Sequence, residues 1–143
     1  RLSGGMRRKA AIAGVLALKP EVLVLDEPTS GLDPQGRRQL MEHLEEFRRR
    51  EGSTIILVTH DMEEVALMAE RVAVLNRGRL VMEGMPREIF NRAEELTAIG
   101  LDLPAPARLM HKLRSLGIAV RTDVLTAAEA EDEIAGLLGD ERC

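Results

Sequence analysis

Residues 22–34 read VLVLDEPTSGLDP, and this stretch decides the fold that the sequence predicts. Its first part, Val22–Leu25, is an unbroken run of apolar, β-forming residues. Unbroken rather than alternating apolar runs are typical of strands that are buried on both faces of a parallel sheet. The run ends in two neighbouring carboxylates, Asp26 and Glu27, and open α/β sheets bind their ligands at the carboxyl ends of the strands. The stretch therefore predicts a parallel sheet with two acidic side chains at its ligand-binding edge.

The residues that follow predict a βαβ arrangement. Asp33 and Pro34 are a capping residue and a first-turn proline, and an amphipathic helical pattern then continues to Gly52. A second apolar run, Thr54–Thr59, is followed directly by His60. Alternation of strand and helix favours an α/β fold with a mostly parallel sheet flanked by helices.

Helices are expected before and after this unit in the sequence. Ser3 is placed to cap an alanine-rich helix over 6–18, and Asp61 with Glu64 has the spacing of a capping box for a helix over 62–70. The next residues predict a hairpin with its turn at 76–78 and short helices within 86–97. Further on, Leu109, Leu113 and Leu116 share one face of a helix, and Thr126 with Glu129 could cap a last one that ends near Leu138. We therefore expect two parts, an α/β part over 1–85 and a small helical extension over 86–143.

Composition excludes several classes of protein. The chain has 143 residues, a net charge of −4, no Trp or Tyr and a single cysteine, Cys143. Its longest apolar run, Ala10–Leu18, is about half of what a membrane-spanning helix needs. The absence of a basic footprint and of stacking aromatics disfavours nucleic-acid binding, and one cysteine suits a reducing compartment such as the cytosol.

Two short motifs carry the candidate chemistry. One carboxylate of Asp26-Glu27 can hold Mg²⁺ on nucleotide phosphates through water, and the other can polarise an attacking water. Taken alone, the pair is as well explained as the end of a strand. Ser3, Gly4 and Gly5 at a helix start offer backbone N–H groups and a positive dipole end to an anion, although a plain capped helix has the same sequence.

Taken together, these motifs resemble the nucleotide-binding subunit of ATP-binding cassette (ABC) transporters. LSGG at 2–5 matches the signature, VLVLDE at 22–27 the Walker B strand, SGLD at 30–33 the D-loop, and VTHD at 58–61 the switch histidine, in the family's order. The resemblance implies the C-terminal half of an ABC ATPase with a P-loop NTPase-like fold.

The resemblance also implies a role for each matched residue. Asp26 would be the Mg²⁺ ligand, Glu27 the general base, and His60 the contact to the γ-phosphate of ATP. Ser3, Gly4 and Gly5 would bind the γ-phosphate of ATP held by a second ABC ATPase subunit. Asp33 would link the two sites of the dimer, which is compatible with its capping the next helix.

Three features set this sequence apart from a complete cassette. The glycine-rich Walker A loop and its lysine are absent, so these residues alone are expected neither to bind ATP tightly nor to hydrolyse it. The chain opens on Arg1 with no targeting signal, and we interpret it as part of a longer protein. Met6 stands where the family usually has Gln, which removes the amide's hydrogen bonds from the signature.

Within the family, the sequence looks most like the energy-coupling factor (ECF) group of vitamin and transition-metal importers, through MRRKAAIAGVLALKPEVLVLDEPTSGLDPQGRRQL at 6–40 and GLDLPAPARLMHKLRSLG at 100–117. This resemblance implies a transmembrane coupling protein and a substrate-capture membrane protein as partners, with the ATPases peripheral to the cytoplasmic face of the membrane. The extension over 100–138 either contacts the partner ATPase or caps the sheet edge.

Two other functions fit the same motifs. A DNA-maintenance or ribosome-associated ABC ATPase shares the signature, Walker B strand and D-loop. A non-catalytic fragment that pairs with another cassette is the third hypothesis. An adjoining Walker A in the same reading frame would favour the transport ATPase over the fragment.

Overall fold

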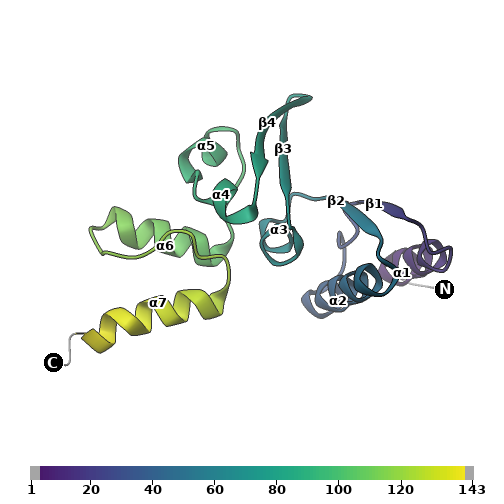
Figure 1. Cartoon of the computed structure of the whole chain (residues 1–143), viewed down its shortest axis with the longest axis horizontal. Helices are drawn as coiled ribbons and strands as arrows, with labels where there is room; N and C mark the ends of the chain where they lie inside the picture. Colours follow the sequence, from purple (N-terminus) through teal and green to yellow (C-terminus); the bar gives the residue numbers. More distant parts are fainter. Residues whose placement is uncertain (1–3, 141–143) are drawn as a thin grey trace. The chain divides into compact units, whose positions relative to one another are not determined.

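The computed structural model describes residues 4–140 of the chain (Figure 1). They form two compact units, one ending at His60 and the other beginning at Asp61. The first unit contains α1 (Gly4–Leu16), β1 (Val22–Asp26), α2 (Pro34–Glu51) and β2 (Thr54–Val58). The second contains α3 (Met62–Met68), β3 (Val72–Asn76), β4 (Arg79–Gly84), α4 (Pro86–Phe90), α5 (Ala93–Ala98), α6 (Ala105–Ser115) and α7 (Ala127–Asp140).

The predicted parallel pairing is present in the first unit. β1 and β2 run parallel, with Val22 opposite Thr54 and Asp26 opposite Val58. The connecting helix α2 starts where its sequence signals place it, because the Asp33 side chain accepts a hydrogen bond from the Gly36 N–H at 2.8 Å. It ends at Gly52, whose φ of 69° is the left-handed conformation that glycine adopts at helix C-termini.

Helix α1 is displaced from its predicted bounds by two residues at each end. It begins at Gly4 rather than Met6 and ends at Leu16 rather than Leu18. The chain leaves the helix through a turn in which the Lys19 N–H bonds the Leu16 carbonyl, before Pro20. The predicted cap, Ser3, lies outside the described residues.

The expectation that both faces of the strands are buried is wrong for this chain. One face is covered: Leu23 is 4% exposed, and α1 and α2 lie on one side of the two strands (Figure 1). The other face leaves four apolar residues about half exposed or more, namely Val22, Val24, Ile56 and Val58, at 49–61%. An apolar run shows that the strand residues are suited to burial, but other elements must cover them. In the described residues, α1 and α2 cover one face of the strands.

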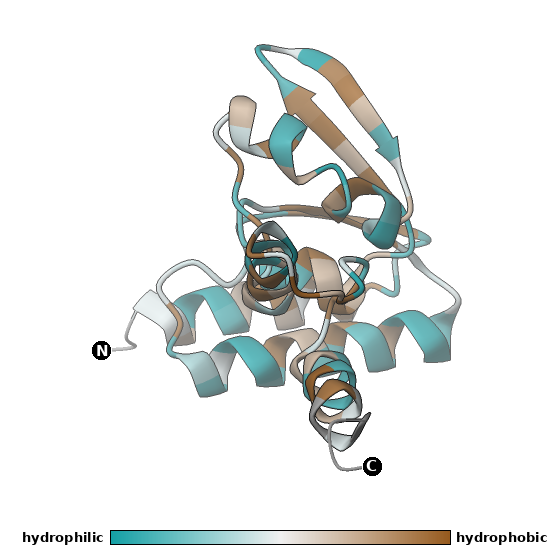
Figure 2. Ribbon diagram, turned by 90° about the vertical axis from the view of Figure 1, so that its left-hand side faces the viewer, coloured by the Kyte–Doolittle hydropathy of each residue, from teal (hydrophilic) through white to brown (hydrophobic). Residues whose placement is uncertain are grey.

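The second unit is built around a hairpin with apolar residues on both strands (Figure 2). β3 and β4 pair antiparallel, and Val74 and Met82, which face each other across the ladder, are each 6% exposed. Arg77 and Gly78 both have positive φ, at 50° and 75°, as a two-residue hairpin turn requires. The core around this pair is completed by Ile89, Phe90, Leu96, Leu103, Ala107 and Leu125.

The helical extension has a smaller core of its own, in which α6 and α7 pack together. Met110 on α6 is fully buried there, beside Val124 and Ala130. Of the three leucines expected to share one face of α6, only Leu113 packs against this cluster, while Leu109 and Leu116 are 44% and 67% exposed. The helix therefore turns the face with Met110 inward, one residue out of phase with the leucines.

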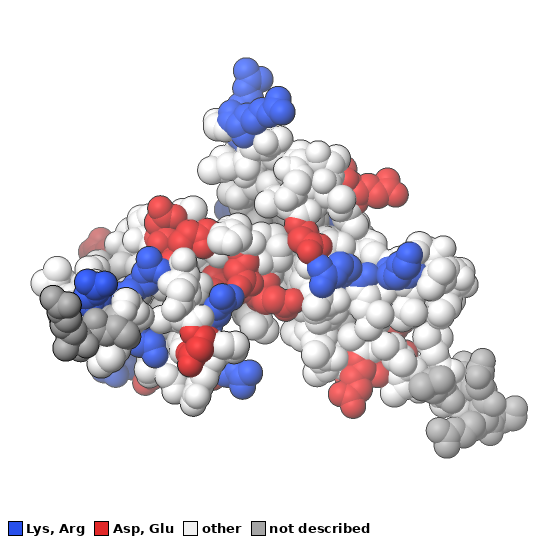
Figure 3. All heavy atoms as spheres, turned by 180° about the vertical axis from the view of Figure 1, so that it is seen from behind, with Lys and Arg blue, Asp and Glu red and all other residues white. Residues whose placement is uncertain are grey.

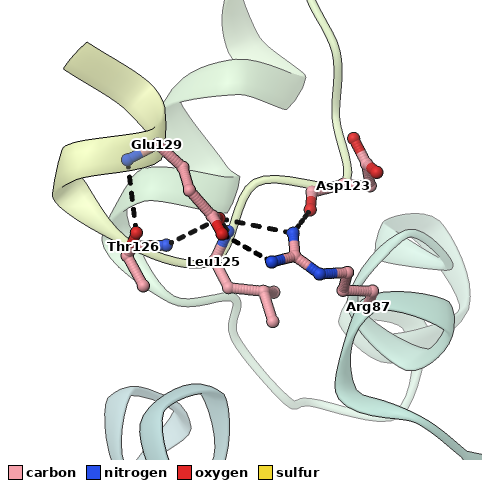
Figure 4. A network of polar contacts seen from close by, with 5 residues as sticks. All are labelled: Arg87, Asp123, Leu125, Thr126 and Glu129. Atoms are coloured by element: carbon pink, nitrogen blue, oxygen red, sulfur yellow. Dashed lines mark hydrogen bonds and ion pairs between the residues drawn. The ribbon is translucent and has the colours of Figure 1, made fainter. Parts of the chain in front are cut away.

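A polar network fixes the start of α7 to α4 (Figure 4). The Arg87 guanidinium donates to the Asp123 carbonyl at 2.6 Å and forms a two-pronged ion pair with Glu129. The Glu129 N–H bonds Thr126 Oγ1 at 3.2 Å, and the Glu129 carboxylate accepts from the Thr126 N–H at 3.3 Å. The predicted cap at Thr126 and Glu129 is confirmed.

This network makes the extension sensitive to acid. Arg87, with the Leu125 and Thr126 N–H groups, lowers the pKa of Glu129 from 4.5 to about 2. Because the folded pKa is depressed, the stabilisation is complete above pH 4.5 and is lost as the pH falls toward 2. We expect a loss of about 1 kcal/mol of unfolding free energy over that range, given solvent screening. Urea unfolding of the chain at several pH values should show this loss, and Glu129→Gln should remove it.

The matched control for that experiment is Glu131→Gln, which changes an exposed carboxylate on the same helix. If the unfolding free energy of Glu129→Gln kept the full pH dependence of the parent chain while that of Glu131→Gln did not, the ion pair between Glu129 and Arg87 would not cause the acid sensitivity.

Two surface properties of the described part bear on function. Acidic and basic side chains are interspersed on the face drawn in Figure 3, and the chain's net charge is −4. None of the helices within residues 4–140 combines the length and the apolar character that crossing a bilayer requires.

Candidate functional site

The ends of the two parallel strands hold three of the predicted site residues, Asp26, Glu27 and His60. Asp26 is the last residue of β1 and lies opposite Val58, the last residue of β2. Glu27 follows Asp26 directly, and its N–H donates to the Val58 carbonyl at 2.8 Å. The two segments that leave the sheet therefore start side by side, and His60 comes two residues after β2.

Glu27 and His60 are in direct contact. Oε1 of Glu27 accepts a hydrogen bond from the His60 N–H at 3.1 Å and lies 2.6 Å from His60 Nδ1. The short contact makes Glu27 Oε1 and His60 Nδ1 hydrogen-bond partners. The side chains of Glu27 and His60 are 33% and 83% exposed, so a ligand from solvent can reach both. The arrangement is an oriented carboxylate beside an imidazole, which is suited to activating a water molecule.

Asp26 offers a second carboxylate at the same edge. It is exposed at the end of β1. Among the described residues, no group of three or more His, Cys, Asp or Glu side chains is arranged to hold a metal ion. Mg²⁺ in nucleotide sites takes only one or two carboxylates and fills its other positions with water and phosphate. A single exposed aspartate beside Glu27 therefore fits Mg²⁺ that arrives with a nucleotide.

The predicted anion clamp lies at the start of α1. Gly4 and Gly5 are the first two residues of this helix, whose first turn contains no acidic residue. The N–H groups of a first turn have no partner within the helix and carry the positive end of its dipole. Ser3 lies outside the described residues, and Met6 is 55% exposed.

Asp33 acts as the cap of α2 and is exposed. Its contact with Gly36 leaves no room for a side chain there, since a Cβ on Gly36 would lie 2.6 Å from Asp33 Oδ1. Capping fixes this carboxylate at the surface, where a second subunit could reach it.

The sequence predictions missed Arg8, which contacts the site from α1. Its Nη1 donates to the Glu27 carbonyl at 3.3 Å and also to the Ser30 carbonyl. The one available signal is that Arg8 lies one helical turn after Gly4 and therefore on the same side of the helix.

Comparisons with known proteins show which proteins this chain is similar to. A family model described as "AAA domain, putative AbiEii toxin, Type IV TA system" matches residues 1–66. The energy-coupling factor transporter ATP-binding protein EcfA2 of Symbiobacterium thermophilum is 52% identical over 96% of this chain and 47% of its own length. EcfA2 of Bacillus licheniformis is 45% identical over 98% of this chain and 49% of its own length.

A solved structure is similar to this chain in both sequence and fold. CbiO1 of Clostridium perfringens, described as part of the ABC transporter complex CbiONQ, is 44% identical, with a TM-score of 0.58 over 77% of this chain and 44% of that one. The chain spans about half the length of the curated relatives it matches. Along nearly its whole length, the chain therefore belongs to the family of energy-coupling factor transporter ATP-binding proteins, with the fold of about half of an ABC ATPase subunit.

Proposed function

We propose that this chain forms part of the ATP-hydrolysing subunit of an ECF-type importer, which couples ATP binding and hydrolysis to the uptake of a vitamin or transition-metal ion. The observation that carries the proposal is the 2.6 Å contact between Glu27 and His60 at the ends of two parallel strands. This contact joins two segments that lie 33 residues apart in the chain, in a protein 52% identical to an ECF ATP-binding protein.

In this proposal Glu27 is the general base. Its carboxylate accepts a proton from the water that attacks the γ-phosphorus of ATP, and His60 holds the carboxylate in place and contacts the γ-phosphate. Asp26 would hold Mg²⁺ through water, and the ion would neutralise charge on the phosphates. Because the attacking water needs orientation as well as activation, the rigid contact between Glu27 and His60 lowers the cost of reaching the reactive geometry.

The second half of the proposal concerns a neighbouring subunit. Ser3, Gly4 and Gly5 would bind the γ-phosphate of ATP held by a second ABC ATPase, so that two ATP molecules are enclosed between two subunits. Asp33 and the extension over 100–138 would contact that partner. A transmembrane coupling protein and a substrate-capture membrane protein would complete the importer, with the ATPases peripheral to the cytoplasmic face of the membrane.

The test separates what this chain supplies from what a complete subunit needs. Residues 1–143 alone are expected to show no ATP turnover above buffer, because no Walker A lysine is present to hold the phosphates. The same residues joined behind the Walker A half of the Symbiobacterium EcfA2 protein should hydrolyse ATP, as measured by phosphate release.

The control for the joined protein replaces the Walker A lysine and should return phosphate release to the level of buffer. Turnover by residues 1–143 alone would contradict the need for the other half. A joined protein that folds and binds ATP but does not hydrolyse it would favour a non-catalytic interaction module.

A further inference from the structure

The backbone at Glu27 is held in an uncommon conformation. Its φ is 46°, in the left-handed region that residues other than glycine rarely occupy. Such a conformation persists only where the surroundings hold it. Within the first unit, the Glu27 N–H bonds the Val58 carbonyl at 2.8 Å, and the Glu27 carbonyl accepts from the Ser30 N–H at 3.2 Å. These contacts set the direction in which the carboxylate leaves the chain.

Arg8 adds a contact from a different element. Its guanidinium donates to the carbonyls of Glu27 and Ser30, the first and last residues of the turn that follows β1. One guanidinium nitrogen, Nη1, makes both contacts, and its positive charge strengthens hydrogen bonds to carbonyl oxygens. Arg8 therefore links the two ends of this turn through contacts from α1.

Helix α1 also packs against the rest of the same loop. A Cβ on Gly5 would lie 2.9 Å from Leu32 Cδ2, so Gly5 is the residue that lets Leu32 approach the helix. Leu32 is 9% exposed. One helical turn after Gly5, Lys9 Nζ lies 3.5 Å from Gln39 Oε1 on α2. The start of α1 and the loop over 27–33 thus contact each other at several points.

We propose that Arg8 is a positioning residue, which holds the backbone of Glu27 so that its carboxylate stays in line for catalysis. The inference rests on the proposed function, in which Glu27 is the base. Arg8 acts through the backbone of residue 27 and touches no reacting atom. Because Arg8 lies on the helix whose first turn would bind the neighbour's nucleotide in the proposed function, it would also connect that clamp to the base of its own subunit.

The first test uses the chain itself and needs no activity. Arg8→Ala should speed hydrogen exchange at the Ser30 and Leu32 amides, which close the turn, by about tenfold. The Gly52 amide, which bonds Arg48 at the far end of α2, should be unchanged. Arg7→Ala is the matched control, since Arg7 is an exposed arginine next to Arg8 on the same helix. Unchanged exchange at both turn amides in Arg8→Ala would overturn the inference.

The second test uses the joined subunit described above. Arg8→Ala should lower kcat about tenfold with the KM for ATP within about twofold, because misplaced catalytic groups slow the chemical step without weakening substrate binding. Arg8→Lys, which keeps the positive charge and a donor nitrogen on a shorter side chain, should recover part of kcat. Arg7→Ala should match the parent protein.

The outcomes separate this inference from the proposed function. If Arg8→Ala keeps full kcat while Glu27→Gln is inactive, the role of Arg8 is refuted and the base stands. If Glu27→Gln retains turnover, the proposed function itself fails. An equal rise in KM and fall in kcat in Arg8→Ala would assign Arg8 to nucleotide binding and would also overturn the inference.

Discussion

Replacing Glu27 by Gln in the joined subunit is expected to lower ATP turnover by about 10³-fold, within the range that a general base contributes. Gln keeps the shape of the side chain and can still accept the hydrogen bond from the His60 N–H, but it cannot take a proton from water. ATP binding should therefore survive. We expect the variant to accumulate as an ATP-bound dimer, measured by phosphate release and by size-exclusion chromatography with ATP.

The control for this variant is Glu42→Gln, which removes an exposed carboxylate from α2 in the same unit. It should hydrolyse ATP at the parent rate. A Glu27→Gln protein that still opened and turned over would place the base on another residue.

Replacing Phe90 by Ala is expected to have the largest effect on stability. Phe90 is 1% exposed, and it lies in the core that joins the hairpin to α4 and α5. Removing a buried phenylalanine side chain costs about 3–5 kcal/mol, since its contacts are lost and the cavity collapses only in part. Urea unfolding of the chain, followed by circular dichroism, should show a lower midpoint.

Leu67→Ala is the comparison, because Leu67 on α3 is 70% exposed. Its unfolding free energy should stay within about 0.5 kcal/mol of that of the parent chain. A loss of less than about 1 kcal/mol in Phe90→Ala would mean that this cluster is not what stabilises the second unit.

Local signals predicted the ends of most elements. Asp33 caps α2 and Gly52 ends it, Asp61 accepts hydrogen bonds from the first turn of α3, and Thr126 caps α7. Caps and turns depend on residues within a few positions of each other, so the sequence contains all the information they need. The turn at Arg77 and Gly78 is predictable for the same reason.

Which face of a helix or strand is buried could not be predicted, because it depends on residues far away in the sequence. Leu109 and Met110 are neighbours on α6, and both belong to plausible apolar faces, yet only Met110 is buried. The packing of α7 decides between them. In the same way, Val24 and Ile56 are apolar residues of predicted strands, but what covers them is not set by the strands themselves.

The candidate site also has a part that the sequence predicts and a part that it does not. Glu27 and His60 could be paired in advance, since parallel neighbouring strands place their carboxyl ends at one edge of a sheet. The contact of Arg8 with that edge could not, because it requires knowing how α1 docks on a loop 19 residues further along the chain. Short-range sequence signals predict α1 and the loop separately, but they do not predict how the two pack against each other.

The open face of the β1–β2 sheet has a consequence inside a cell. Val22, Val24, Ile56 and Val58 form a row of β-branched side chains that water does not solvate well. Chaperones and proteases continuously screen proteins for such surfaces, and the surviving amount of a protein depends on how long they stay uncovered. A polypeptide that leaves these side chains uncovered stays open to such screening until another surface packs on them.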